Sequence, residues 1–154
     1  GNADAFVNAI CHHMSNMMTP SLQVSMNELS NHDHSRFLTR TNHRVGRVQE
    51  LGAEAANENV NVAVMREAVV MQMTVYYGDE AGVCGFTDPD NRRTYPWGHE
   101  DQELIAFHRE MIRIHKRYPV FREGSVQMLE WRENVLAYAR TDQNQRIVVM
   151  LWRK

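Results

Sequence analysis

The sequence has 154 residues, of which 43% are hydrophobic and 23% are charged, and this composition is typical of a globular domain with a sizeable core. The formal net charge of −2 excludes a strongly charged surface, so we expect neither a nucleic acid nor a membrane surface as a partner. No stretch is apolar for long enough to cross a membrane, and the N-terminus lacks the pattern of a signal peptide.

The two cysteines, Cys11 and Cys84, are too few for a disulfide framework. They favour free thiols in a reducing compartment, and we therefore expect a cytoplasmic protein. The first residues of the sequence already lie within a helical pattern, which suggests that the chain is the middle of a longer protein.

The N-terminal part combines a predicted helix with a predicted strand. Residues 4–18 predict a helix because apolar side chains recur at helical spacing, and Thr19-Pro20-Ser21 ends the pattern. Residues 22–29 are interpreted as a strand, with a helical turn as the alternative because their apolar pattern is weak. The loop after it, residues 30–37, holds an imidazole, a carboxylate and a guanidinium, and the loops at strand ends carry the chemistry of α/β barrels.

The middle of the chain alternates helices with one further strand. We expect a short helix over 48–56, a strongly apolar helix that opens at 57–59 and runs to Thr74, and a strand at 75–77. Residues 79–98 then form a long loop, and loops of this length are usually functional or mobile.

The C-terminal part changes its pattern at one point. Residues 102–118 predict a helix that Pro119 ends, and from Gly124 onward the apolar period becomes two. This period predicts an antiparallel meander of three strands (126–129, 135–139 and 147–151). We expect a domain boundary between Pro119 and Gly124.

Three blocks of the sequence together resemble the α-amylase family of glycoside hydrolases. Asn31-His32-Asp33 followed by Arg36-Phe37 is similar to the fourth sequence region of that family, and residues 75–82 are similar to its segment at the eighth barrel strand. Residues 88–92 with Trp97 resemble the neopullulanase, cyclomaltodextrinase and maltogenic amylase branch. The order and separation of the blocks also fit, and the likeness spans nearly the whole chain.

The junction between Thr74 and Val75 is the one place where the pattern fails. A predicted helix meets a predicted strand there with no connector, although such a connection normally takes about 2–6 residues. The family that the sequence resembles has a Pro-Gly-x-Pro-type connector before the Tyr76-Tyr77-Gly78 block, and this connector is absent. We predict that residues are missing at this junction, either deleted or not resolved.

The resemblance implies a fold and an activity. The fold is α/β: the C-terminal portion of a (β/α)8 barrel with strands seven and eight in residues 1–120, and the start of an antiparallel β domain in residues 121–154. The activity is retaining hydrolysis of α-1,4 and possibly α-1,6 glucosidic bonds in maltodextrin, cyclodextrin or pullulan. The family's nucleophile and acid/base belong to strands four and five, so this chain alone is expected to be inactive.

The resemblance also assigns roles to five residues. Asp33 is the carboxylate that supports the transition state, and His32 donates a hydrogen bond to the same sugar. Arg36 tethers Asp33 or the neighbouring loop backbone and takes part in substrate binding. Arg92 and Trp97 shape the sugar cleft, although Trp97 is equally well explained as ordinary loop core.

Metal binding is the main alternative for the first loop. His32, Asp33 and His34 are spaced closely enough to hold a metal, but no second cluster completes a set of four ligands. Asp88 and Asp90 superficially resemble a calcium loop, yet no bidentate glutamate follows at the required position. We therefore expect no cofactor, and a turn stabilised by aspartate side chains at residues 88–91.

Asp79 and Glu80 follow the predicted strand at 75–77, where they could face a cleft. The structural role is the preferred interpretation, in which they cap the backbone or pair with a nearby arginine.

Three hypotheses for the function stay open from the sequence. The chain is part of an α-glucan hydrolase, a non-catalytic amylase-like scaffold, or an inactive barrel fragment. In each case strands seven and eight would present open edges. We therefore expect an α-glucan oligosaccharide as ligand, and as protein partner the remainder of the barrel or another copy of the chain, possibly as a homodimer.

Overall fold

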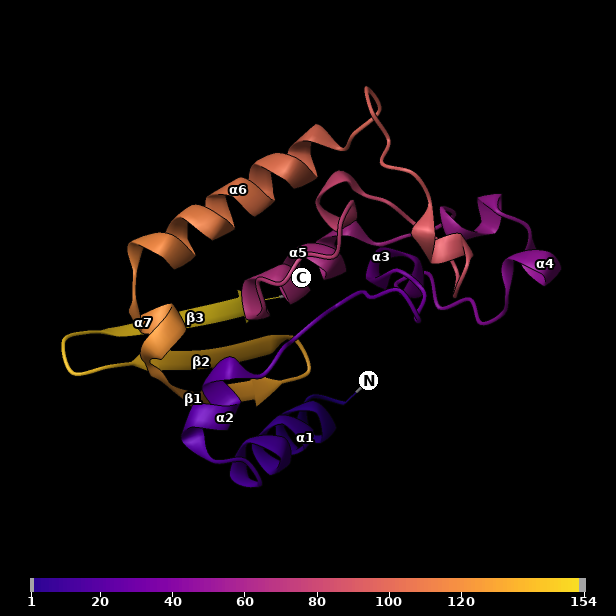
Figure 1. The fold of residues 1–154 in the computed structure, drawn as a ribbon. Helices are drawn as coiled ribbons and strands as arrows, with labels where there is room; N and C mark the ends of the chain where they lie inside the picture. The colour runs from indigo at the N-terminus through magenta and orange to yellow at the C-terminus, as the bar shows by residue number, and fades with distance from the viewer. Residues whose placement is uncertain (1, 153–154) are drawn as a thin grey trace. The chain divides into compact units, whose positions relative to one another are not determined.

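The computed structural model describes residues 2–152 and forms two compact units. One unit contains residues 2–25 and 114–152, and the other contains Met26–Arg113. Figure 1 gives the order of the elements along the chain. Within residues 2–152, no helix is both long enough and apolar enough to span a bilayer. The predicted division at residue 120 stays a prediction.

The first unit begins with α1 (Ala3–Ser15), which confirms the N-terminal helix predicted over 4–18. The Asn2 side chain caps the helix by accepting a hydrogen bond from the Asp4 amide at 2.8 Å. The helix ends at Ser15 rather than at residue 18, with Asn16 as its C-cap.

The predicted strand over 22–29 is wrong. Thr19–Val24 form the short helix α2, and residues 25–28 form neither a helix nor a strand. Pro20 lies in the first turn of α2, where its missing N–H costs nothing, so it starts a helix instead of ending one. An extended segment also becomes a strand only when a neighbouring strand supplies hydrogen bonds.

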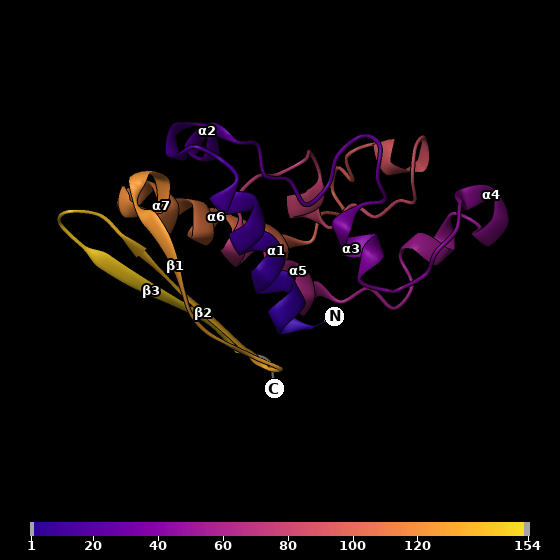
Figure 2. The same cartoon turned by 90° about the horizontal axis from the view of Figure 1, so that it is seen from below.

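The C-terminal meander is confirmed. Three antiparallel strands pair in the order β1-β2-β3, with Tyr138 opposite Met128 and Val149, and α7 precedes them (α7 Val120–Glu123, β1 Ser125–Arg132, β2 Val135–Thr141, β3 Arg146–Trp152). The indole N–H of Trp131 on β1 donates to the Asp4 carboxylate at 2.9 Å, which ties α1 to the sheet. Figure 2 shows the same sheet from below.

The second unit is built from short helices and turns around one apolar core. Its elements are α3 (Phe37–Arg40), α4 (Val48–Leu51), η1 (Glu54–Ala56), α5 (Val62–Met71), η2 (Asp79–Ala81), η3 (Asp90–Arg92) and α6 (Gln102–Arg117), which runs on into the first unit. The core side chains are Leu38, Ala55, Ala56, Met65, Val69, Cys84, Phe86 and Leu104. Both α5 and α6 contribute to this core, which confirms the apolar faces that their sequences predict.

The region of the junction differs in detail from its prediction. Helix α5 begins after its cap Asn61 and ends at Met71, so residues 72–74 form a short connector. The chain runs on through Thr74 to residues 75–77, which are not a strand in this structure. A deletion relative to the family stays a prediction.

The predicted long loop over 79–98 is confirmed, and two glycines shape it. Gly78 has a φ of 84°, which favours glycine, and an added Cβ would lie 2.6 Å from Cγ2 of Val83. Gly85 lies against the backbone of Asp90 and Asn91 so closely that a side chain would collide with it. The loop therefore folds back on itself beside residues 30–37.

We predict that Gly78→Ala destabilises the protein more than Gly82→Ala does. Both glycines are in the left-handed region with φ near 80°, so alanine costs about 1–2 kcal/mol at either position. An added Cβ at Gly82 makes an ordinary van der Waals contact of 3.4 Å with Cβ of Asp101, whereas at Gly78 it overpacks Val83, which adds about 1–3 kcal/mol. Urea denaturation of the two variants measures the difference, and equal losses would contradict the close approach at Val83.

Candidate functional site

The loop that carries His32 and Asp33 is held by its own backbone and by Asn31. The Asn31 side-chain oxygen accepts hydrogen bonds from the amides of Asp33 and His34, both at 2.9 Å. Its side-chain nitrogen donates to the Glu28 carboxylate at 2.6 Å. This Asx turn fixes the backbone that carries the side chains of His32 and Asp33.

His32 and Asp33 present their side chains to solvent next to each other. Nε2 of His32 lies 3.5 Å from Oδ1 of Asp33, and the two side chains are 60% and 68% exposed. Both polar ends are therefore accessible to a ligand that binds this face of the loop. An ionised carboxylate offers acceptors and an imidazole offers one donor, so together they can bind adjacent hydroxyl groups.

Arg36 lies beneath the loop and is fully buried. Its Nε donates to the Asn91 carbonyl at 2.7 Å, and its Nη1 donates to the Tyr77 carbonyl at 2.6 Å and to the Asp79 carboxylate at 3.1 Å. The guanidinium carbon also lies 4.3 Å from the centre of the Tyr76 ring. Arg36 thus binds the backbone of other loops rather than the Asp33 carboxylate.

Asp79 has the structural role that its sequence position predicts. Its carboxylate is 3% exposed and pairs with Arg36. Burial raises the pKa of Asp79 above its ordinary value, against hydrogen bonds from Ser30 and Arg36 that lower it. The Ser30 hydroxyl oxygen in turn accepts from the Phe37 amide at 2.9 Å, which joins both ends of the His-Asp loop to Asp79.

Arg92 and Trp97 lie on the following loop. Nε of Arg92 donates to the Asp88 carboxylate at 2.5 Å, and its side chain is half exposed. Trp97 is 79% exposed, and its ring centre lies 4.5 Å from that of Tyr95 at an interplanar angle of 48°. This exposure excludes a core role for Trp97 within the described chain.

The turn at residues 88–91 is stabilised by aspartate side chains, as predicted. Oδ2 of Asp90 accepts from the Phe86 amide at 2.8 Å, and the Asp90 carboxylate also pairs with Arg93. Over residues 2–152, the structure brings together no group of three or more His, Cys, Asp or Glu side chains placed to hold a metal ion.

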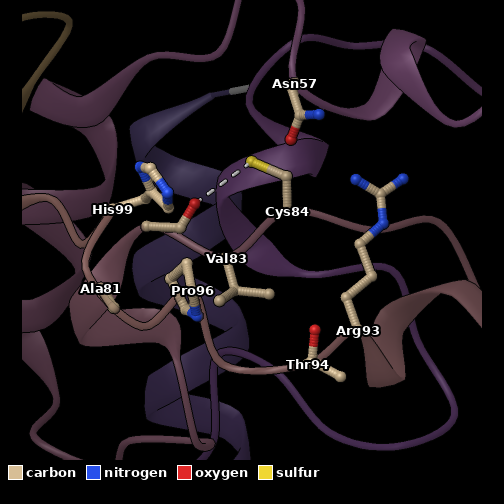
Figure 3. A pocket seen from close by; sticks show the side chains of 9 residues that line it. Asn57, Ala81, Val83, Cys84, Arg93, Thr94, Pro96 and His99 are labelled. Atoms are coloured by element: carbon tan, nitrogen blue, oxygen red, sulfur yellow. Dashed lines mark hydrogen bonds between the residues drawn. The ribbon is translucent and has the colours of Figure 1, made fainter.

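A pocket of about 210 Å³ lies elsewhere in the second unit (Figure 3). Its floor includes Cys84, whose Sγ lies 3.7 Å from the Gly82 carbonyl, and burial raises the pKa of this thiol. Both cysteines are free. Within the described part of the chain, the pocket is lined by Asn57, Ala81, Gly82, Val83, Cys84, Arg93, Thr94, Pro96 and His99. None of the five predicted site residues is among them.

The sequence reasoning missed the importance of Asn91. This side chain is fully buried, and its Nδ2 donates to the carbonyls of Asn31 at 3.2 Å and His34 at 2.8 Å. The available signal was an asparagine directly after Asp90 in a loop that resembles the family motif. That signal indicates a turn, but it does not indicate which distant loop the asparagine binds.

Comparison with known proteins identifies relatives, although no protein-family model matches the chain. It is 35% identical over 135 residues to an amylopullulanase from Thermoanaerobacter thermohydrosulfuricus, covering 79% of this chain and 8% of the relative. It is 35% identical over 135 residues to neopullulanase 2 from Thermoactinomyces vulgaris, covering 81% of this chain and 20% of the relative. The chain therefore spans only a small part of these enzymes.

The fold agrees with a solved structure. A cyclic α-maltosyl-(1→6)-maltose hydrolase from Arthrobacter globiformis matches with a TM-score of 0.81 at 22% identity, over 99% of this chain and 33% of that enzyme. The fold is therefore that of the C-terminal part of a barrel enzyme, and it includes a three-stranded antiparallel sheet. More particularly, the chain is a homologue of the neopullulanase, cyclomaltodextrinase and maltogenic amylase branch, which confirms the resemblance of its motifs.

We predict that Arg36→Lys lowers the free energy of unfolding by about 3–5 kcal/mol. A lysine ammonium is a point charge that cannot reach the Asn91 carbonyl, the Tyr77 carbonyl and Asp79 together, so buried acceptors lose their donors. Chemical denaturation followed by circular dichroism measures the loss. The matched control is Arg66→Lys, since Arg66 pairs with an exposed Glu103 and should lose less than about 1 kcal/mol.

The raised pKa of Asp79 predicts a pH dependence. Between the ordinary pKa of about 4 and the raised folded value, the folded chain binds more protons than the unfolded chain. The contribution of Asp79 to stability is therefore largest at low pH and falls as pH rises through this window. Unfolding free energies of the wild type and Asp79→Asn, measured in urea from about pH 3.5 to 6.5, should diverge in slope there. Parallel profiles would contradict the raised pKa.

Proposed function

We propose that this chain is part of an α-glucan hydrolase, in which the His32–Asp33 loop forms one wall of the sugar site. The observation that carries the proposal is the exposed pair itself. Two polar side chains with complementary hydrogen-bonding capacity stand 3.5 Å apart on a loop whose backbone is fixed from within. The names of the relatives support an α-glucan as the ligand, since they include an amylopullulanase and a neopullulanase.

Asp33 acts on the sugar ring at the bond that breaks. Its carboxylate accepts hydrogen bonds from ring hydroxyls, and these strengthen as positive charge develops on the sugar in the transition state. His32 donates a hydrogen bond to the same sugar unit. The resemblance places the nucleophile and the acid/base outside these 154 residues, so the chain contributes binding and electrostatic stabilisation but no turnover of its own.

Arg36 serves the site as a positioning residue. Its side chain has no exposed surface from which to touch a sugar, and it joins the loop to Tyr77, Asp79 and Asn91. This assignment replaces a direct role in substrate binding.

Trp97 and Arg92 extend the sugar-binding surface. The exposed Trp97 ring and the neighbouring Tyr95 offer aromatic faces on which the apolar face of a pyranose can pack. The half-exposed Arg92 adds hydrogen-bond donors beside them. No metal takes part in this proposal.

The partner of the chain is the remainder of a barrel or another copy of the chain, possibly as a homodimer. Large apolar side chains are exposed in both units, and such side chains are normally covered by protein (Met18, Val24, Met26, Met150 and Trp152). The free cysteines are consistent with the reducing environment of the cytoplasm, where we place the protein.

We predict that maltotriose shifts the NMR signals of His32 and Asp33 with a dissociation constant on the order of millimolar, since one wall of a site binds weakly. Asp33→Asn should weaken binding by roughly 10- to 100-fold, because a hydrogen bond to a charged acceptor is lost. The matched control is Asp142→Asn, where the amide oxygen can still accept from the turn amides of Asn144 and Gln145.

Two results would overturn the proposal. One is an unchanged spectrum of the His32–Asp33 loop at saturating maltotriose. The other is release of reducing sugar from maltodextrin, cyclodextrin or pullulan by this chain alone, because turnover would require a nucleophile and an acid/base among its own residues.

A further inference from the structure

We propose that Asn91 is a positioning residue for the glucan site, whose side-chain amide holds the two peptide groups that bracket His32 and Asp33. The inference rests on the proposed function and deepens it. It adds a buried residue from a different loop that determines where the two sugar-binding side chains stand, without touching the sugar.

The side-chain amide of Asn91 has only one chemically sensible orientation. Nδ2 faces two carbonyl oxygens, those of Asn31 at 3.2 Å and His34 at 2.8 Å. The reverse orientation would place the amide oxygen against both carbonyls and leave no hydrogen between them. The amide nitrogen carries two hydrogens, so each carbonyl receives one.

The two carbonyls belong to Asn31 and His34, the residues on either side of the His32–Asp33 pair. The amides of Asp33 and His34 are already bound to the side chain of Asn31. Asn91 therefore completes a frame in which the backbone is held on both sides of the exposed pair. A hydrogen-bonded backbone limits how far the two side chains can move relative to each other.

Asn91 is itself held from the opposite side. Its own carbonyl accepts from Nε of Arg36 at 2.7 Å, and the side chain is fully buried. Gly85 lies directly against its backbone, and the neighbouring Asp90 carboxylate accepts from the Phe86 amide. The position of Asn91 is thus set by the core of the second unit, and Asn91 transmits that position to the loop.

An asparagine is needed because both carbonyls must be satisfied at once. A serine hydroxyl has one hydrogen and can serve one carbonyl, an alanine serves neither, and an aspartate carboxylate would repel both. We therefore expect residues 31–34 to be most rigid with asparagine at position 91, less rigid with serine and still less with alanine. Aspartate at this position should disrupt the loop most.

The experiment uses backbone ¹⁵N relaxation together with maltotriose titration of the full 154-residue chain. In Asn91→Ala the order parameters of residues 31–34 should fall from about 0.85 to below about 0.6. Maltotriose affinity should fall roughly 10-fold or more, because the two ligand groups lose their fixed geometry. Asn91→Ser should lie between the wild type and alanine, and it decides the question if the alanine variant does not fold.

The chain offers a matched control in Asn42. Nδ2 of Asn42 also donates to two backbone carbonyls, those of Ala55 and Glu58, both at 3.1 Å. Asn42→Ser replaces the two-hydrogen amide by a one-hydrogen hydroxyl, as Asn91→Ser does, but in a different loop. It should leave both the order of residues 31–34 and the affinity for maltotriose unchanged, even where it lowers stability as much as Asn91→Ser.

The outcomes separate this inference from the proposed function. If the wild type binds maltotriose and Asn91→Ser changes neither the loop nor the affinity, the positioning role is wrong while the function stands. If residues 31–34 become more mobile in Asn91→Ser but the wild type binds no maltotriose, the proposed function is wrong, although Asn91 does hold the loop. If Asn42→Ser loosens residues 31–34 equally, the effect is general loss of stability and the role of Asn91 is overturned.

Discussion

The buried guanidinium of Arg36 is the interaction on which the second unit depends. It satisfies acceptors on two other segments of the chain, at positions 41 to 55 residues further along the sequence. A buried cation is costly unless it is paired and hydrogen-bonded, and Arg36 is paired with Asp79 and packed against Tyr76. The pair therefore contributes specificity of arrangement, because a packing that separated these segments would leave a buried charge without its partner.

This constraint explains why an exposed site can be well defined without a strand beneath it. In a complete barrel, paired strands fix the loops at their ends. In the described chain, residues 25–28 and 75–77 belong to no strand, and side-chain contacts hold the loops instead. Arg36, at the end of the His32–Asp33 loop, binds the backbone of Tyr77. Asn91, in the loop over residues 79–98, binds the backbone of Asn31 in the His32–Asp33 loop.

The parts that the sequence predicts correctly are those whose signal is local. Helix α6 and the C-terminal meander depend on apolar periods of their own, and both are found where expected. The strand expected over 22–29 fails because a strand depends on partners that periodicity cannot supply, and because Pro20 is compatible with the first turn of a helix. The pairing of Asp79 with an arginine is predicted correctly from residue chemistry.

The particular partners of Arg36 and the role of Asn91 could not be predicted from the sequence, for a different reason. Each acts through backbone carbonyls, which every residue possesses, so no residue type at the far end marks the contact. Motif likeness points to His32 and Asp33 because they are the unusual residues, whereas the groups that hold them are ordinary peptides. Since a ligand site requires fixed geometry as well as suitable functional groups, the buried side chains that bind those peptide groups belong to the proposed site as much as the two side chains that face solvent.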